Sequence, residues 1–212
     1  MVATVRSNPR RIKAVLGKDA MGPMLRSTAV VLLCCSSLLA QAQPGSYPPP
    51  VELPIQNIPQ ETQVWCWAAV AQQIILASRG QRGTPAQCEL VARAFGKHPA
   101  SCCNDIRRCS VTGQLPQIQN LIAEFGGRHS SIEAPTDPMT VYQTLKAGKA
   151  IIMAVKASPF AGHVVVLRGM AWMPTPWGVE PVLLINDPMA YYSQPLPFRE
   201  VARIWESAIV VR

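Results

Sequence analysis

The sequence has few charges, few histidines and no uncharged apolar run long enough to cross a membrane. Charged residues make up 15% of the 212 residues, and there are three histidines. Six of the 20 Lys and Arg and one of the 12 Asp and Glu lie in residues 1–42, so the remainder carries 14 basic and 11 acidic side chains, a net charge of +3. This small excess gives no support to a nucleic-acid partner. A membrane span needs about 20 apolar residues, so we expect no stable membrane insertion.

The first 42 residues have the pattern of an export signal. Arg26 precedes an apolar stretch from Thr28 to Leu39, and the small-x-small site Ala40-Gln41-Ala42 follows. We expect cleavage after Ala42 and a mature chain in the periplasm or outside the cell. Residues 43–58 form a proline-rich extended lead-in, and residues 59–212 are long enough for one domain with a full core.

The order of elements predicts an α+β domain. Helices are expected at residues 66–79, 84–96 and 113–125, with a fourth opened by Thr136-Asp137-Pro138 and closed by Gly148. Short β-branched runs follow at residues 150–155, 163–172, 179–187 and 208–212, with a hairpin turn at 173–178. Helices first and hairpin-linked strands second predict an N-terminal helical half and a C-terminal antiparallel sheet.

The cysteine count after the export signal is odd. Four cysteines cluster in 22 residues, namely Cys88, Cys102, Cys103 and Cys109. Their spacing lacks the paired C-x2-C pattern of a zinc site, and an exported chain favours disulfides. A bond between the adjacent pair would be strained, which leaves 88–102 with 103–109, or 88–103 with 102–109. Cys66 is left over.

Cys66 stands at the expected start of the central helix, where the helix dipole and unpaired N–H groups favour a thiolate. A nucleophilic thiol also needs a proton carrier. His163 begins an apolar strand, and Gly162 in front of it leaves room for a substrate. The plainer interpretation makes Cys66 a small buried hydrophobe and His163 an ordinary strand residue.

Two further pairs of residues complete a candidate site. Asp187 or Asn186, which end the strand paired with that of His163, could hold the imidazole in one tautomer, although Asp-Pro is also a common turn. Gln60 could donate to the oxygen that gains charge when a carbonyl is attacked, and Gln63 is its competitor. Spacing alone does not choose between the two glutamines.

Taken together these residues resemble the papain-like cysteine peptidases, whose order is Gln, Cys, His and Asn or Asp. Trp65-Cys66-Trp67-Ala68-Ala69 with Asn186-Asp187-Pro188 is more similar to bacterial secreted and effector peptidases, and to those that trim bacteriocin leaders, than to papain. The resemblance spans about residues 55–190. It implies Gln60 as oxyanion-hole donor, Cys66 as nucleophile, His163 as base and Asp187 as orienter, with Asn186 as the alternative.

The expected function is hydrolysis of peptide bonds in peptide or protein substrates through an acyl-enzyme. Two alternatives are an amidase or acyl transferase of the same fold acting on cell-wall peptides, and a non-catalytic binding module stapled by disulfides. A pure binder has no reason to leave a thiol unpaired in an oxidising space. The chemistry needs no cofactor and no metal, and we expect a monomer.

Overall fold

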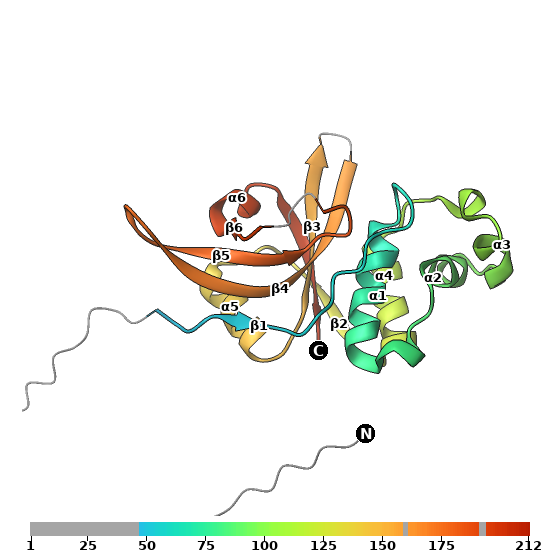
Figure 1. Cartoon of the computed structure of the whole chain (residues 1–212), viewed down its shortest axis with the longest axis horizontal. Helices are drawn as coiled ribbons and strands as arrows, with labels where there is room; N and C mark the ends of the chain where they lie inside the picture. The colour runs from blue at the N-terminus through green and yellow to red at the C-terminus, as the bar shows by residue number, and fades with distance from the viewer. Residues whose placement is uncertain (1–46, 159–160, 191–193) are drawn as a thin grey trace, which may run out of the picture. The chain divides into compact units, whose positions relative to one another are not determined.

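The computed structural model describes residues 47–158, 161–190 and 194–212. The expected export signal lies outside them. The described part of the chain starts with a short strand and a helical half, and then forms a sheet, which confirms the α+β class and the antiparallel sheet (Figure 1). The helices are α1 (Cys66–Arg79), α2 (Gln87–Ala94), α3 (Pro99–Cys103), α4 (Leu115–Leu121), α5 (Pro138–Lys146) and α6 (Phe198–Ala202). The strands are β1 (Val51–Glu52), β2 (Ser130–Glu133), β3 (Ile151–Ser158), β4 (Ala161–Thr175), β5 (Gly178–Asn186), β6 (Leu196–Pro197) and β7 (Trp205–Val211).

Helix α1 has the bounds expected from the sequence. It ends at Gly80, whose φ of 71° is open to glycine and whose N–H donates to the Leu76 carbonyl at 2.8 Å. The run from Trp67 to Ala71 is fully buried, so more than one side of the helix faces the core. A helix that is apolar on several sides is buried, and α1 is accordingly the central helix of its half.

The helix expected at residues 84–96 is shorter, because Ala86 caps it. The Ala86 N–H donates to the Glu89 carboxylate at 2.8 Å, which leaves Pro85 outside α2. Residues 97–113, which the sequence predicts as a loop, contain α3 and a 3₁₀ turn, Ile106–Cys109. Disulfides join Cys88 to Cys103 and Cys102 to Cys109, the second of the two expected pairings. The bridges thus staple the loop to α2.

The sheet is antiparallel with strand order β2-β7-β3-β4-β5-β6, and β1 pairs with β4 just beyond the start of β3. The expected hairpin joins β4 to β5, where Thr175 lies opposite Gly178. Strands β1, β2 and β6 and helix α6 were not expected. They are two to five residues long, too short for a hydrophobic period to be visible in the sequence.

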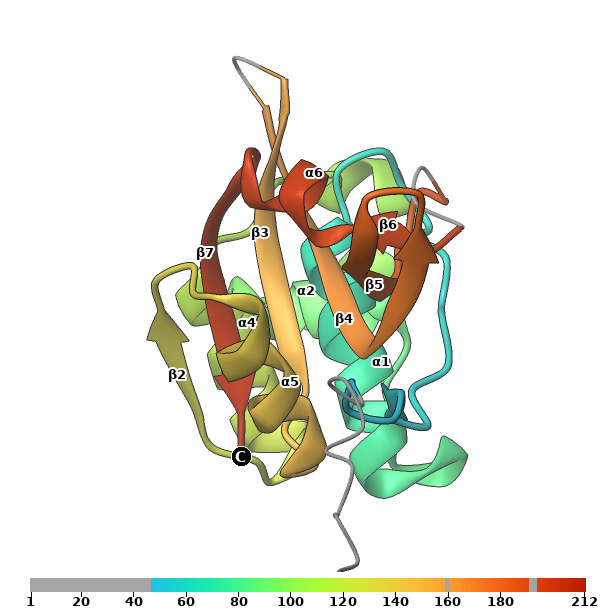
Figure 2. The same cartoon turned by 90° about the vertical axis from the view of Figure 1, so that its left-hand side faces the viewer.

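Two cores cover the two faces of the sheet. Ile152, Val164 and Val166 join the core around α1, whereas their neighbours Ile151 and Val165 join a second core with α5 and α6. Figure 2 shows α5 in front of the sheet and α1 behind it. Successive strand residues point to opposite faces. Burial on both sides therefore explains why the strand sequences are continuous apolar runs rather than alternating ones.

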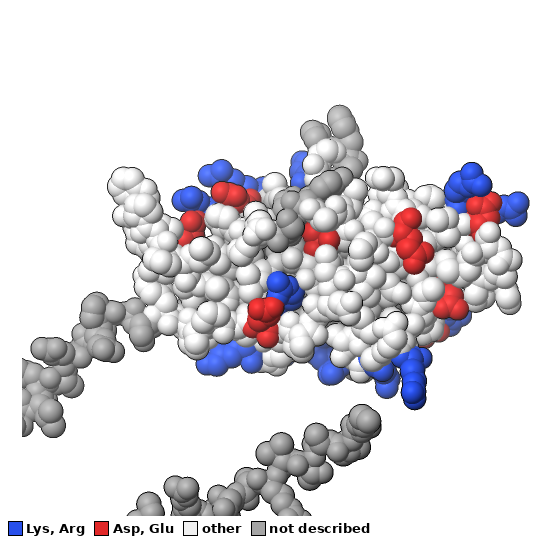
Figure 3. Space-filling view, in the orientation of Figure 1, with Lys and Arg blue, Asp and Glu red and all other residues white. Residues whose placement is uncertain are grey.

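Charges on the face seen in Figure 3 are interspersed rather than gathered into one basic patch. Within the described residues, no helix has the length and hydropathy of a membrane span.

We predict that Gly113→Ala destabilises the fold by about 1–3 kcal/mol, the usual range for overpacking. A Cβ on Gly113 would overlap the indole of Trp67, which is almost fully buried and whose N–H is bonded to the Val111 carbonyl. Gly126→Ala is the matched control, since its nearest neighbour would be Ile75 at 3.7 Å, and it should be close to neutral. Urea unfolding of the two variants measures the difference. Equal free energies of unfolding would show that Gly113 does not support the Trp67 ring.

Candidate active site

Cys66 is the first residue of α1 and the one free thiol among the described cysteines. It is half-buried, so a reagent or substrate can reach it. The N–H groups of the first helical turn have no partners within the helix, and together with the helix dipole they favour negative charge at this end. The position expected from the sequence is therefore the one that the structure shows.

The two tryptophans beside Cys66 anchor the start of α1. The indole N–H of Trp65 donates to the Cys109 carbonyl at 2.9 Å, and that of Trp67 donates to the Val111 carbonyl at 3.1 Å. Both rings are buried, with exposed fractions of 0% and 2%. Cys109 is itself held by a disulfide. The stapled loop thus fixes the position of the helix start and of its thiol.

His163 lies near the start of β4 and Asp187 directly follows β5. Because Val166 pairs with Asn186 across the two strands, the residues that follow β5 return toward the start of β4. The His163 Nε2 atom and the Asp187 Oδ1 atom are 2.6 Å apart, and both side chains are almost fully buried. The Met189 N–H also donates to Oδ1, at 2.9 Å. A short contact in a buried site makes this a strong, charge-assisted hydrogen bond.

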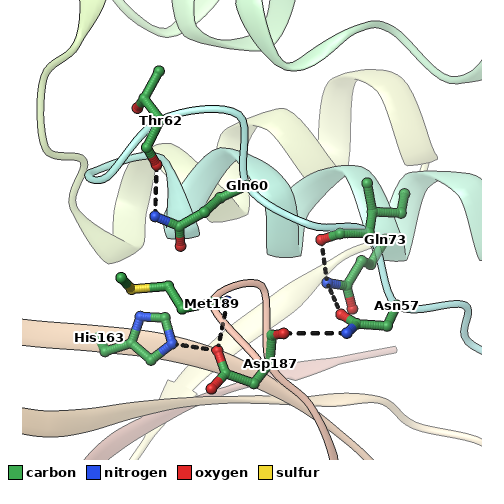
Figure 4. A network of polar contacts seen from close by, with 8 residues as sticks. Asn57, Gln60, Thr62, Gln73, His163, Asp187 and Met189 are labelled. Atoms are coloured by element: carbon green, nitrogen blue, oxygen red, sulfur yellow. Dashed lines mark hydrogen bonds and ion pairs between the residues drawn. The ribbon is translucent and has the colours of Figure 1, made fainter. Parts of the chain in front are cut away.

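His163 also forms a hydrogen bond with Cys66, and both partners affect its pKa. Burial alone would lower this pKa, but the hydrogen bonds of His163 with Asp187 and with Cys66, and the charges of both partners, outweigh burial and raise it to about 9. The Nε2 atom forms the hydrogen bond with Asp187, and the second ring nitrogen, Nδ1, points away from the Asp187 carboxylate (Figure 4). The imidazole thus lies between the carboxylate and the thiol, and its environment favours the protonated form.

Asn186 has a different partner from Asp187. Its amide N–H donates to the Ile55 carbonyl at 2.8 Å, and the side chain is buried. It therefore holds the lead-in against the end of β5. Of the two candidates that the sequence left open, it is Asp187 that contacts His163.

A polar network that the sequence did not reveal contacts Asp187 on the side away from His163 (Figure 4). Asn57 donates to the Asp187 carbonyl at 3.1 Å, and Gln73 of α1 donates to the Asn57 amide oxygen at 3.1 Å and to the Ile58 carbonyl at 3.2 Å. Gln73 is fully buried. A glutamine on the apolar side of a central helix was the one signal that could have pointed to it, because buried polar groups need partners.

The two glutamines near Cys66 are placed differently. The Gln60 amide donates to the Thr62 carbonyl at 2.6 Å, and its backbone N–H donates to the Pro188 carbonyl at 3.1 Å. Gln63 lines the cleft together with Cys66. The segment 60–63 therefore bridges the region after Asp187 and the start of α1.

The cleft that Cys66 and His163 line has a volume of about 710 Å³ and two walls. The helical wall consists of Gln63, Val64, Cys66, Trp67, Thr112, Gly113, Gln114, Leu115 and Ile118. The sheet wall consists of Ala154, Val155, Ala157, Gly162, His163, Val164, Met189, Glu206 and Ser207. A reacting group between the walls would therefore lie beside both the thiol and the imidazole.

The four clustered cysteines are all in disulfides, which removes them as zinc ligands. In the described ranges, no group of three or more His, Cys, Asp and Glu side chains has an arrangement suited to a metal ion.

Comparisons with known proteins agree with this geometry. The family described as "Papain-like cysteine protease AvrRpt2" matches residues 50–196, and a search of curated proteins found no match. A structure described as a C39-like peptidase from Bacillus anthracis is similar with a TM-score of 0.51 and 14% identity, over 77% of this chain and 97% of that one. UfSP from C. elegans gives a TM-score of 0.47 and 13% identity, over 81% of this chain and 35% of that one.

The chain thus spans about a third of the length of UfSP and nearly the whole of the Bacillus anthracis structure. The latter likeness, at 14% identity, supports the fold alone. The family match covers more than half of the chain and includes both Cys66 and His163. The chain belongs to the papain-like cysteine protease family of AvrRpt2, and it is a cysteine peptidase.

Proposed function

We propose that this peptidase is exported and that it cleaves peptide bonds with a triad of Cys66, His163 and Asp187. The observation that carries the proposal is the buried 2.6 Å contact of His163 with Asp187, on an imidazole that also contacts Cys66 in an open cleft. Export rests on the pattern of residues 1–42, and the two disulfides support it because such bonds persist in oxidising compartments.

In the acylation step the Cys66 thiolate attacks the carbonyl carbon of the peptide. The carbonyl electron pair moves to oxygen, and when it returns, the C–N bond breaks and His163 gives its proton to the leaving amine. The Cys66 sulfur then holds the acyl group as a thioester. Neutral His163 next takes a proton from water while the water oxygen attacks the thioester carbonyl. The C–S bond then breaks, which releases the acyl group as a carboxylic acid and regenerates the thiolate and the imidazolium.

The oxyanion needs donors that are in place before the reaction. The backbone N–H of Cys66 lies at the start of α1 among the unpaired N–H groups of the first turn. Gln60 can add a second donor, since its amide has two N–H groups and the Thr62 carbonyl accepts one of them. Gln63, which lines the cleft, is the alternative donor.

Asp187 acts through His163. Its carboxylate accepts a hydrogen bond from the ring at Nε2, which leaves Nδ1 for the proton exchanged with Cys66 and substrate. The Met189 N–H and the Asn57 amide hold Asp187 in position. Asp187 therefore sets the tautomer of the imidazole and stabilises its positive charge.

We predict that Cys66→Ala abolishes cleavage and leaves the unfolding temperature nearly unchanged, because the side chain is half-buried and loses one sulfur atom. A thiol-directed epoxide should add one label to the mature wild-type chain and none to the variant, as read by intact mass. Casein and a cell-wall peptide are then compared as substrates. Absence of labelling contradicts a reactive thiol, and labelling with cleavage of the wall peptide alone favours the amidase.

We predict that Asp187→Ala lowers kcat roughly ten- to a hundredfold, whereas Asn186→Ala has a smaller effect on kcat and lowers stability by about 1 kcal/mol. The first variant removes the partner of His163, and the second removes one hydrogen bond to the Ile55 carbonyl. Steady-state kinetics and urea unfolding separate the two. A larger loss of kcat in Asn186→Ala would assign the orienting role to Asn186.

We predict that kcat/KM falls as the pH rises through about 9, because the leaving amine needs the proton of His163 and the environment raises the His163 pKa to about 9. In Asp187→Ala the fall should begin at a lower pH, since that variant loses interactions that raise the pKa. Profiles of kcat/KM against pH measure this shift. The same alkaline limb in both enzymes would contradict a role for Asp187 in holding the proton.

A further inference from the structure

Strand β7 has a bulge beside the cleft. Ala154 of β3 pairs with Ser207, and the next residue, Val155, pairs with Trp205, so Glu206 is an extra residue without a partner across the ladder. The Trp205 indole N–H donates to the Ser207 carbonyl at 2.8 Å, so this hydrogen bond joins the two residues on either side of Glu206. Bulges are frequent next to active sites, where they change the direction of a side chain.

The bulge places Glu206 on the cleft side of the sheet. Trp205 is buried in the second core with Val155, on the face that carries α5 and α6. Glu206 and Ser207 both line the cleft, as Ala154 does. Without the extra residue only one of the two would face the cleft, because strand residues alternate between faces. The sheet wall thereby gains a carboxylate.

This carboxylate has no partner in the part of the chain that the structure describes. Glu206 is exposed and takes part in no ion pair or hydrogen bond there. Among the described residues that line the cleft it is the one acidic side chain, and the facing helical wall supplies no Lys or Arg. An exposed glutamate is ordinarily a solvated surface group, but this one lies in the concave surface that receives the substrate.

We propose that Glu206 is a specificity residue that selects peptide substrates with a Lys or Arg side chain next to the β7 wall. The inference rests on the proposed peptidase function and adds to it the class of substrate. A basic side chain in the cleft would pair with the carboxylate in a charge-assisted hydrogen bond. An acidic side chain in the same place would be repelled, so the discrimination has an attractive and a repulsive part.

The test uses a set of fluorogenic peptides in which one Lys is moved through each position around the scissile bond. Matched sets carry norleucine or Glu in place of the Lys. At one position the wild-type mature enzyme should favour Lys over norleucine by about two- to fivefold in kcat/KM, the size expected of a partly exposed charge pair. This preference should shrink as the salt concentration rises.

Two variants assign the preference to a residue. Glu206→Gln should bring the Lys-to-norleucine ratio close to one, and Glu206→Arg should favour the Glu peptide. Glu200→Gln is the matched control, because Glu200 is an exposed acid on α6 outside the cleft lining, and its ratio should equal that of the wild type.

A wild-type enzyme that cleaves the peptides without a preference for Lys, or a preference that survives Glu206→Gln, overturns the role of Glu206 and leaves the peptidase intact. An enzyme whose Cys66 takes no epoxide label and which cleaves no peptide overturns the peptidase proposal, and the substrate class with it.

Discussion

The buried pair of His163 and Asp187, held against Cys66, is the constraint on which the site depends. An imidazolium and a carboxylate can share a buried site because each stabilises the charge of the other, whereas either of them alone would be costly to bury. The sheet supplies His163 and Asp187, and the helical half supplies Cys66. The chemistry therefore requires the two halves to keep a fixed relative position to within a hydrogen-bond length.

Two sets of hydrogen bonds hold the halves in that relative position, one on the helical side and one on the sheet side. On the helical side, the indole N–H groups of Trp65 and Trp67 donate to the main-chain carbonyls of Cys109, which is held by a disulfide, and of Val111. The residues that follow, 112–114, contribute to the helical wall of the cleft. On the sheet side, the lead-in runs between the halves, and Asn57 links Gln73 of α1 to the Asp187 carbonyl. The first set positions the Cys66 thiol, and the second positions the Asp187 carboxylate. Both consist of hydrogen bonds, which are more directional than apolar contacts.

Much of the site could be predicted because its residues have local signatures. A cysteine at the start of an apolar helix, a glycine-histidine pair at a strand and an Asn-Asp-Pro turn are visible in a few letters each. The positions of Gln73 and Asn57 could not be predicted, because their partners are separated by 15 to 130 positions in the chain. The same holds for Glu206: a bulge is a property of strand pairing, and strand β7 by itself shows no sign of it.

The sequence by itself determined the class of fold, the bounds of α1, the four longer strands of the sheet and the candidates Cys66 and His163, because hydrophobic period and helix-end chemistry are local properties. Only the tertiary structure decided that Asp187 rather than Asn186 meets the histidine, that Cys88 pairs with Cys103, and that Glu206 faces the cleft. Those choices lie between neighbouring residues of equal chemical suitability. The register of the strands and the packing of distant segments against each other decide between them.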